Sequence, residues 1–102
     1  MVRLLVFFKE PPDPAEFQRW YYETHLPLVR KIPHLKGPYV SDGPVDVDGD
    51  EEQVHFVVEL EYESREKLAE SAASPEFAAG SKDLEENASG LYSFTTYDVK
   101  EA

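Results

Sequence analysis

The alternation of side chains between Val54 and Tyr62 constrains the fold of this chain more than any other sequence feature. Apolar side chains take every second position, at Val54, Phe56, Val58, Leu60 and Tyr62, and the positions between them hold His55, Val57, Glu59 and Glu61. Because successive side chains of a β-strand point to opposite faces of a sheet, this spacing predicts a strand with one apolar face. His55 and Glu59 are expected on the other face.

Three further segments are predicted to be strands. Val2–Phe8 is apolar at every position except Arg3, which is typical of a central strand buried on both faces. Lys36–Val45 contains two Gly-Pro pairs, and because proline removes a backbone donor, this strand is expected at a sheet edge. Leu91–Val99 closes the chain as a strand with aromatic side chains on both faces.

The first helix is defined by its start and by an aromatic stripe. Asp13 suits the N-cap, Pro14 the first helical position and Glu16 the reciprocal position of a capping box. Side chains spaced three and four apart then form one inward-facing stripe, made of Phe17, Trp20, Tyr21, Thr24, His25 and Leu28. Pro27 lacks the N–H that would reach back one turn, so a kink or an early end is expected in the turn that holds His25.

The second helical region is predicted in pieces. Ser64 caps a short helix that runs through Ala73, and Ser74-Pro75 starts another with a second cap-and-proline pair. Gly80-Ser81 is expected to interrupt this second helix before a last turn over Asp83–Asn87.

The order of elements is β-α-β-β-α-β, which predicts a ferredoxin-like α+β fold with a four-stranded antiparallel sheet and helices on one face. The length of 102 residues fits a single domain spanning 1–102. The other sheet face would expose a larger apolar patch than a soluble monomer usually tolerates. We therefore expect an identical chain to cover it, giving a homodimer through the sheet face.

Charge and composition exclude several kinds of partner. Twenty-one acidic residues against ten basic ones give a formal net charge of −11 at pH 7, which repels nucleic acid phosphates and anionic lipid. The absence of cysteine excludes disulfides and thiolate chemistry. No apolar run approaches the length of a signal peptide or a membrane span. We expect a cytoplasmic protein without nucleic-acid or membrane partners.

Familiar catalytic and metal-binding motifs are missing. The sequence has no His-Glu-x-x-His, no Gly-x-Ser-x-Gly and no glycine-rich phosphate loop. The acidic loop over residues 46–52 begins like an EF-hand but lacks the glycine at its sixth position and the glutamate at its twelfth. No metal site is expected, although one assembled in space from His25, His55 and Glu59 stays open as an alternative.

His25 is the main candidate for chemistry, because an imidazole with an unperturbed pKa near neutrality suits general acid or base work. With equal weight, it is a core histidine satisfied by carbonyls that Pro27 leaves free. Glu59 or His55 would orient a substrate or set the protonation of His25 if their sheet face looks into a cavity.

Aromatic side chains are numerous for so small a core. Core and dimer contacts account for most of them, and the remainder indicates a pocket for a flat, apolar or aromatic ligand. The candidate ligand-binding residues are Phe8, Trp20, Tyr21, Tyr22, Tyr39, Tyr62, Phe94 and Tyr97.

The first helix also carries a resemblance to a known family. The segment Glu16-Phe17-x-x-Trp20-Tyr21-Tyr22-x-x-His25-Leu26-Pro27-Leu28-Val29-Arg30-Lys31-Ile32-Pro33 resembles the signature of EthD-like proteins. The likeness continues through the strand ending at Tyr62, through Ser74-Pro75-Glu76 and through the last strand. The sequence departs from the pattern at His34, where the family more often has glycine, and in its acidic loop.

This resemblance implies a dimeric α+β barrel, in which the sheets of two ferredoxin-like subunits pack together. It also implies a cavity between sheet and helices, no bound cofactor, and a family histidine at His25. Family members include a protein tied to ether degradation and fungal enzymes acting on polyketide or anthraquinone intermediates. We expect either cofactor-independent chemistry by His25, of the isomerase, dehydratase or oxygenase type, or a non-catalytic ligand-binding or structural dimer.

Overall fold

A four-stranded antiparallel sheet organises the molecule, as seen in a computed structural model that describes residues 1–49 and 53–102. The elements in chain order are β1 (Val2–Phe8), α1 (Pro14–Trp20), the π-helical turn η1 (Tyr21–His25), α2 (Leu26–Val29), β2 (Lys36–Val40), β3 (Phe56–Tyr62), α3 (Arg65–Ala72), α4 (Pro75–Ala88) and β4 (Tyr92–Asp98). The strand order is β2-β3-β1-β4, with every pairing antiparallel. This arrangement confirms the predicted ferredoxin-like α+β fold.

The register of the strands decides which side chains share a face. β1 lies in the centre, as predicted, and pairs with both β3 and β4. Val6 stands opposite Val58 and Phe94, so these three side chains point to one face. Leu5 stands opposite Glu59, and both point to the other face.

The edge strand β2 is shorter than predicted. It ends at Val40 rather than at Val45. Ser41 makes the last contacts with β3, because its N–H donates to the carbonyl of Val57 at 2.9 Å and its hydroxyl accepts from the Val57 N–H at 3.0 Å. The chain then leaves the sheet before Pro44, which has no N–H to donate to the ladder. Residues 46–49 of the predicted acidic loop form no regular element, and residues 50–52 lie outside the described part.

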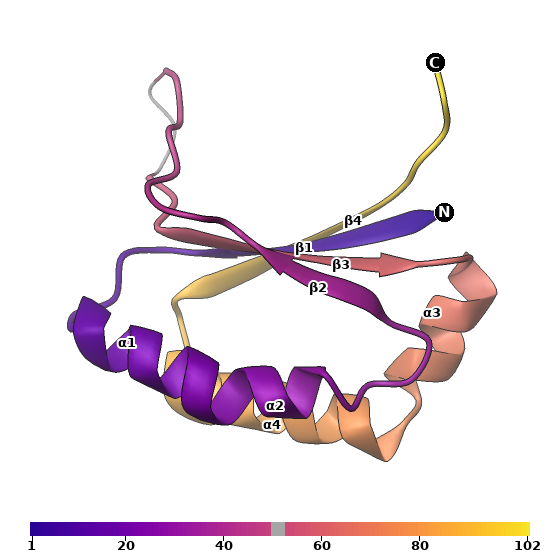
Figure 1. Ribbon diagram of the computed structural model, residues 1–102, viewed down its shortest axis with the longest axis horizontal. Coiled ribbons are helices and arrows are strands. Elements are labelled where there is room, and N and C mark those ends of the chain that lie inside the picture. The colour runs from indigo at the N-terminus through magenta and orange to yellow at the C-terminus, as the bar shows by residue number, and fades with distance from the viewer. Residues whose placement is uncertain (50–52) are drawn as a thin grey trace.

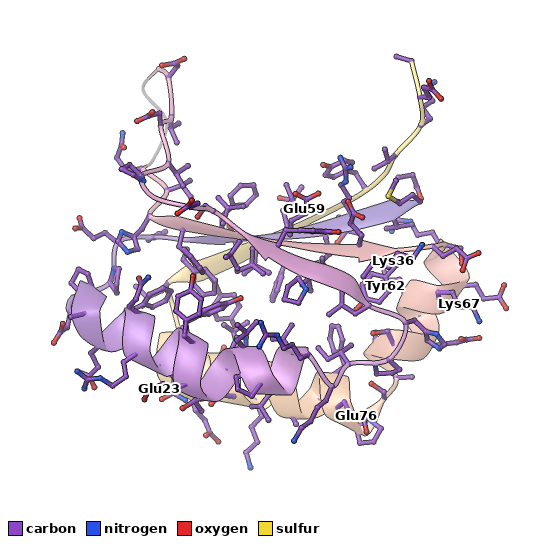
Figure 2. The ribbon with its side chains drawn as sticks, viewed as in Figure 1. Glu23, Lys36, Glu59, Tyr62, Lys67 and Glu76 are labelled. Atoms are coloured by element: carbon purple, nitrogen blue, oxygen red, sulfur yellow. The ribbon has the colours of Figure 1, made fainter. Side chains whose placement is uncertain are left out.

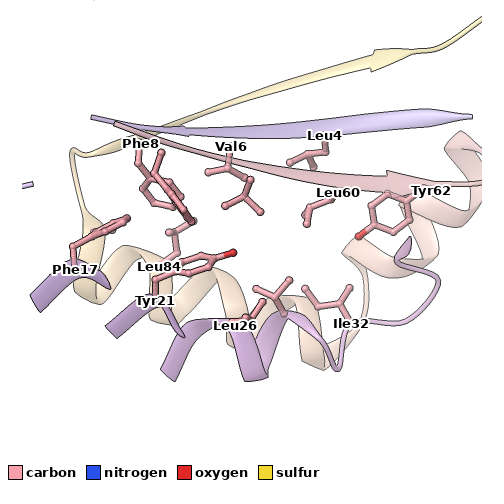
Figure 3. Close-up of a cluster of buried hydrophobic side chains, with 14 of the residues drawn as sticks. Leu4, Val6, Phe8, Phe17, Tyr21, Leu26, Ile32, Leu60, Tyr62 and Leu84 are labelled. Carbon is pink, nitrogen blue, oxygen red and sulfur yellow. The ribbon is translucent and has the colours of Figure 1, made fainter. Parts of the chain in front are cut away.

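The helices lie together on one face of the sheet (Figure 1). Buried side chains from β1 and β3 meet those of the helices there, and the cluster shown in Figure 3 includes Val6, Phe8, Phe17, Tyr21, Leu26, Leu60 and Leu84. Among the described elements, no helix covers the opposite face, on which Leu5 and Phe7 are half-buried. No helix within residues 1–49 and 53–102 is long and apolar enough to cross a membrane.

The first helix begins as predicted but does not end early. The Asp13 carboxylate accepts the N–H of Glu16 at 3.2 Å. A π-helical turn follows α1, in which the N–H of Leu26 donates to the carbonyl of Tyr21, five residues back. The wider turn relieves the crowding that the ring of Pro27 would cause in an α-helix, so the chain stays helical through Val29.

The second helical region is less segmented than predicted. α3 ends at Ala72, but α4 runs without interruption through Gly80 and Ser81. Gly80 is buried, and a Cβ added there would lie 3.8 Å from Cδ1 of Ile32, which follows α2. The prediction of a break was wrong because a glycine inside a helix costs only about 1 kcal/mol, which helix packing readily offsets.

Candidate functional site

A mainly apolar cavity lies between the covered face of the sheet and the helices. Its lining comes from β1, η1, α2, β3, α4 and β4: Leu4, Val6, Phe8, Tyr21, His25, Val29, Ile32, Val58, Leu60, Phe77, Gly80, Ser81, Leu84 and Phe94. About 520 Å³ inside it is free of protein atoms, part of which is open solvent. The cavity is small and partly open to solvent, and its lining is mainly apolar.

His25 is brought to this cavity by the π-helical turn. Its side chain is buried, with 6% of the residue exposed, and its Nδ1 lies 2.9 Å from Oδ2 of Asp83 on α4. An ionised carboxylate only accepts hydrogen bonds, so the proton on the neutral imidazole is assigned to Nδ1. Nε2 then carries the lone pair, and no residue of the described chain hydrogen-bonds to it.

Asp83 holds several groups at once. Its Oδ2 also accepts the indole N–H of Trp20 at 3.1 Å, and its Oδ1 accepts the side-chain amide of Asn87 at 2.9 Å. Trp20 in turn stacks on His25, with ring centroids 5.0 Å apart and an interplanar angle of 30°. The imidazole is thereby fixed in position by a hydrogen bond at one edge and an aromatic ring on one face.

Sequence reasoning missed Asp83. A signal was present, because Asp83 lies next to the inward-facing Leu84 and three residues after Gly80 on the same helix. Asn87, one turn later, adds a polar partner. The helix break expected at Gly80-Ser81 placed Asp83 in a separate turn. Its position beside the apolar stripe of one continuous helix was therefore not recognised.

Burial sets the protonation of His25. Desolvation lowers its pKa below the ordinary value of 6.5, and the hydrogen bond and charge of Asp83 oppose that effect. The imidazole is therefore neutral at pH 7. Nε2 can then take a proton, and the carboxylate of Asp83 stabilises the cation that results.

Tyr21 is the other polar group of the cavity wall contributed by η1. Its residue is 1% exposed, and its hydroxyl has no hydrogen-bond partner among the described residues. Figure 3 shows the hydroxyl directed into the space between the sheet and the helices. Burial raises the pKa of Tyr21 well above its ordinary value, so the hydroxyl stays protonated and can donate a hydrogen bond.

The two groups expected to orient His25 do not meet it within the chain. Glu59 points to the sheet face away from the helices, whereas its near neighbour Tyr62 points toward them (Figure 2). The Glu59 carboxylate pairs instead with Nε of Arg3, 2.9 Å away. His55 precedes β3 and lies edge-on to Phe17, with ring centroids 6.0 Å apart. No three His, Asp or Glu side chains gather as a metal site in the described part of the chain.

The predicted ligand-binding aromatics divide into three groups. Those that line the cavity are Phe8, Tyr21 and Phe94. Those that are buried or half-buried elsewhere are Trp20, which supports His25, and Tyr62, whose hydroxyl lies 2.8 Å from that of Ser71. Those that are exposed and do not line the cavity are Tyr22, Tyr39 and Tyr97, whereas Phe94 lines the cavity and is itself 53% exposed. The third group lies outside the cavity of the single chain.

The fold and its cavity define the class of ferredoxin-like α+β proteins with helices on one sheet face. Residues 9–89 match the model of the EthD domain, so this chain belongs to the EthD family. It is similar to an uncharacterized 11.0 kDa protein in the thcB-thcC intergenic region of Rhodococcus erythropolis, with 33% identity over 91 residues, covering 88% of this chain and 86% of the relative.

Two solved structures are also similar. A crystal structure of an ethyl tert-butyl ether d (EthD) family protein from Bacillus halodurans matches with a TM-score of 0.88 and 29% identity, covering 98% of this chain and 99% of the other. A dimeric protein of unknown function with a ferredoxin-like fold from Bacteroides fragilis matches with a TM-score of 0.62 and 22% identity, covering 96% of this chain and 95% of the other. The second likeness concerns the fold alone.

Proposed function

We propose that this protein binds a small, largely apolar molecule in the cavity beside His25 and moves a proton on it without a cofactor. The observation that carries the proposal is the pairing of Nδ1 with Asp83, 2.9 Å away, in a wall that is otherwise mostly apolar. That pairing orients the ring and leaves Nε2 as a neutral base. Trp20, stacked on the ring, limits its rotation.

A positioned base of this kind has a defined chemical use. It removes a proton from a ligand carbon or oxygen held against Nε2, and the Asp83 carboxylate stabilises the imidazolium while the proton is held there. The proton then returns to another atom of the ligand, which suits isomerisation or dehydration. General base catalysis contributes a factor of about 10²–10⁴ to such reactions.

The proposed working form is a homodimer through the open sheet face. Leu5, Phe7 and Val57 are only half-buried on that face, and Tyr97 is 39% exposed. A second sheet packed on these side chains would remove them from water. The ferredoxin-like protein from Bacteroides fragilis is dimeric, which supports a dimer for a chain of this fold.

The second candidate is a binding or structural dimer without chemistry. The observation that favours it is that Asp83 accepts from three side chains, Trp20, His25 and Asn87. Such a network ties the first helix to α4 and would be sufficient reason for a buried histidine. In this case Nε2 never takes a proton from a ligand.

Hydrogen–deuterium exchange separates the two candidates. Cyclohexanone is the probe, because its carbon-bound hydrogens next to the carbonyl exchange in D₂O when a base removes a proton and the electron pair shifts to oxygen. The matched variant is His25→Asn, whose amide still donates to Asp83 while Nε2 is lost. Exchange about 10²-fold faster with the parent than with His25→Asn is expected. Equal rates would show that His25 moves no proton and would favour the second candidate.

A further inference from the structure

We infer that the Tyr21 hydroxyl binds an acceptor oxygen of the ligand, which makes the ligand a small, neutral carbonyl compound. This inference rests on the proposed function and adds the chemical class of the molecule. It starts from a buried hydroxyl without a partner, the one buried side-chain N or O atom in the described chain with no hydrogen bond.

A buried hydroxyl without a hydrogen bond lowers the stability of the fold, and the other fully buried tyrosine does not have this defect. Tyr62 is equally buried, and its hydroxyl meets that of Ser71 at 2.8 Å. Buried polar groups are nearly always satisfied in this way, because an unmade hydrogen bond forfeits the hydration that the group had in water. The hydroxyl of Tyr21 therefore requires a partner from outside the chain.

The aromatic surroundings of Tyr21 restrict where that partner can be. Its ring packs against Phe56 and Phe8, with centroids 4.9 and 6.3 Å away, and is stacked on Phe17 at 6.4 Å. These contacts fix the ring, and the residue lines the cavity. The hydroxyl is directed into the space between the sheet and the helices (Figure 3), so its partner is expected on the cavity side of the ring.

The second polar group of η1 defines the rest of the ligand. The rings of Tyr21 and His25 have centroids 5.6 Å apart, so one small molecule can contact both. The protonated hydroxyl donates, while Nε2 of the neutral imidazole accepts. A carbonyl oxygen matches the donor, and a hydrogen on the neighbouring carbon or oxygen matches the acceptor.

Charge excludes an anionic ligand. The lining residues include no lysine or arginine, and the chain carries a formal net charge of −11. A carboxylate would lose its hydration there without gaining a cation. A neutral ketone, aldehyde or ester loses far less, and the apolar lining accepts its hydrocarbon part.

Two probes of nearly equal shape test this inference: cyclohexanone, and methylenecyclohexane, in which a CH₂ group replaces the oxygen. Binding is measured by NMR titration of the parent, of Tyr21→Phe, and of Tyr62→Phe as the matched control. We expect the parent to prefer cyclohexanone about tenfold and Tyr21→Phe to lose that preference. Tyr62→Phe should keep it and lose stability, because it leaves Ser71 without its partner.

The outcomes separate the inference from the proposed function. If both probes bind the parent equally, or if Tyr21→Phe still prefers cyclohexanone, the hydroxyl does not select the ligand and the inference is overturned. The first result would assign the hydroxyl to a retained water molecule. If neither probe binds while the parent is folded, the proposed small-molecule site itself fails.

Discussion

Replacing Asp83 with asparagine should lower the pKa of His25. The amide is nearly the same size as the carboxylate, and its oxygen can still accept the Nδ1 proton of His25. In the parent, Nδ1 of His25 lies 2.9 Å from Oδ2 of Asp83. The negative charge is lost, and with it the hydrogen bond from the Asn87 side chain, because the nitrogen that replaces Oδ1 cannot accept. Burial, which already lowers the pKa of His25, then acts without the opposing charge.

The size of the change follows from the hydrogen bond. A bond to an ionised acceptor contributes about 1–1.5 kcal/mol more than a bond to a neutral one. Because one pKa unit corresponds to about 1.4 kcal/mol, the pKa of His25 should fall by about one unit or more. The substitution also removes the Coulombic attraction between protonated His25 and the Asp83 carboxylate, which lowers the pKa of His25 further.

The assay is NMR of the imidazole carbon and nitrogen resonances over a pH series. Glu86→Gln is the control, because it removes a carboxylate from the same helix at a side chain that is 61% exposed. That variant should leave the titration of His25 unchanged. A pKa of His25 that is equal or higher in Asp83→Asn than in the parent would refute the assigned role of Asp83.

Two further predictions concern stability and assembly. Folding lowers the pKa of His25 below 6.5, so as the pH falls the unfolded chain binds a proton at His25 before the folded chain does. The contribution of His25 to the free energy of unfolding is therefore fully present above about pH 6.5 and decreases as the pH drops toward the folded pKa. Urea unfolding over that pH range should therefore show a smaller loss of stability in His25→Asn than in the parent. An identical loss in the two proteins would contradict the lowered pKa of His25. Thr95 stands opposite Leu5 on the open sheet face and Thr96 opposite Leu4 on the helix face, and both are exposed. Sedimentation should show that Thr95→Glu weakens the homodimer while Thr96→Glu does not; a stable parent monomer at micromolar concentration would contradict the proposed dimer.

The sequence predicted the fold because its strongest signals are local. The alternating strand predicted from Val54 to Tyr62 is present from Phe56 to Tyr62, and the cap at Asp13 appears as expected. The ends of elements were less predictable, since they depend on contacts between distant segments. Gly80 stays helical because it packs on Ile32, which no pattern within α4 reveals.

The candidate site was predictable only where it depends on local spacing, and not where it depends on contacts between distant segments. The inward direction of His25 follows from helical spacing, although the same spacing wrongly predicted that Thr24, which is exposed, faces inward. The partner of His25, Asp83, is 58 residues away along the chain. Glu59, chosen from its place on a strand, lies on the face away from His25, because the helices cover the face of Tyr62. The unpartnered hydroxyl of Tyr21 is a property of the packed core and has no sequence signature.

The most direct test of the proposed ligand site is a crystal structure of the protein soaked with cyclohexanone. We expect the ring in the cavity between β1, β3 and the helices, with the carbonyl oxygen at hydrogen-bond distance from the Tyr21 hydroxyl and the neighbouring carbon facing Nε2 of His25. A cavity that holds only water at saturating cyclohexanone, or a ligand bound away from both side chains, would contradict it.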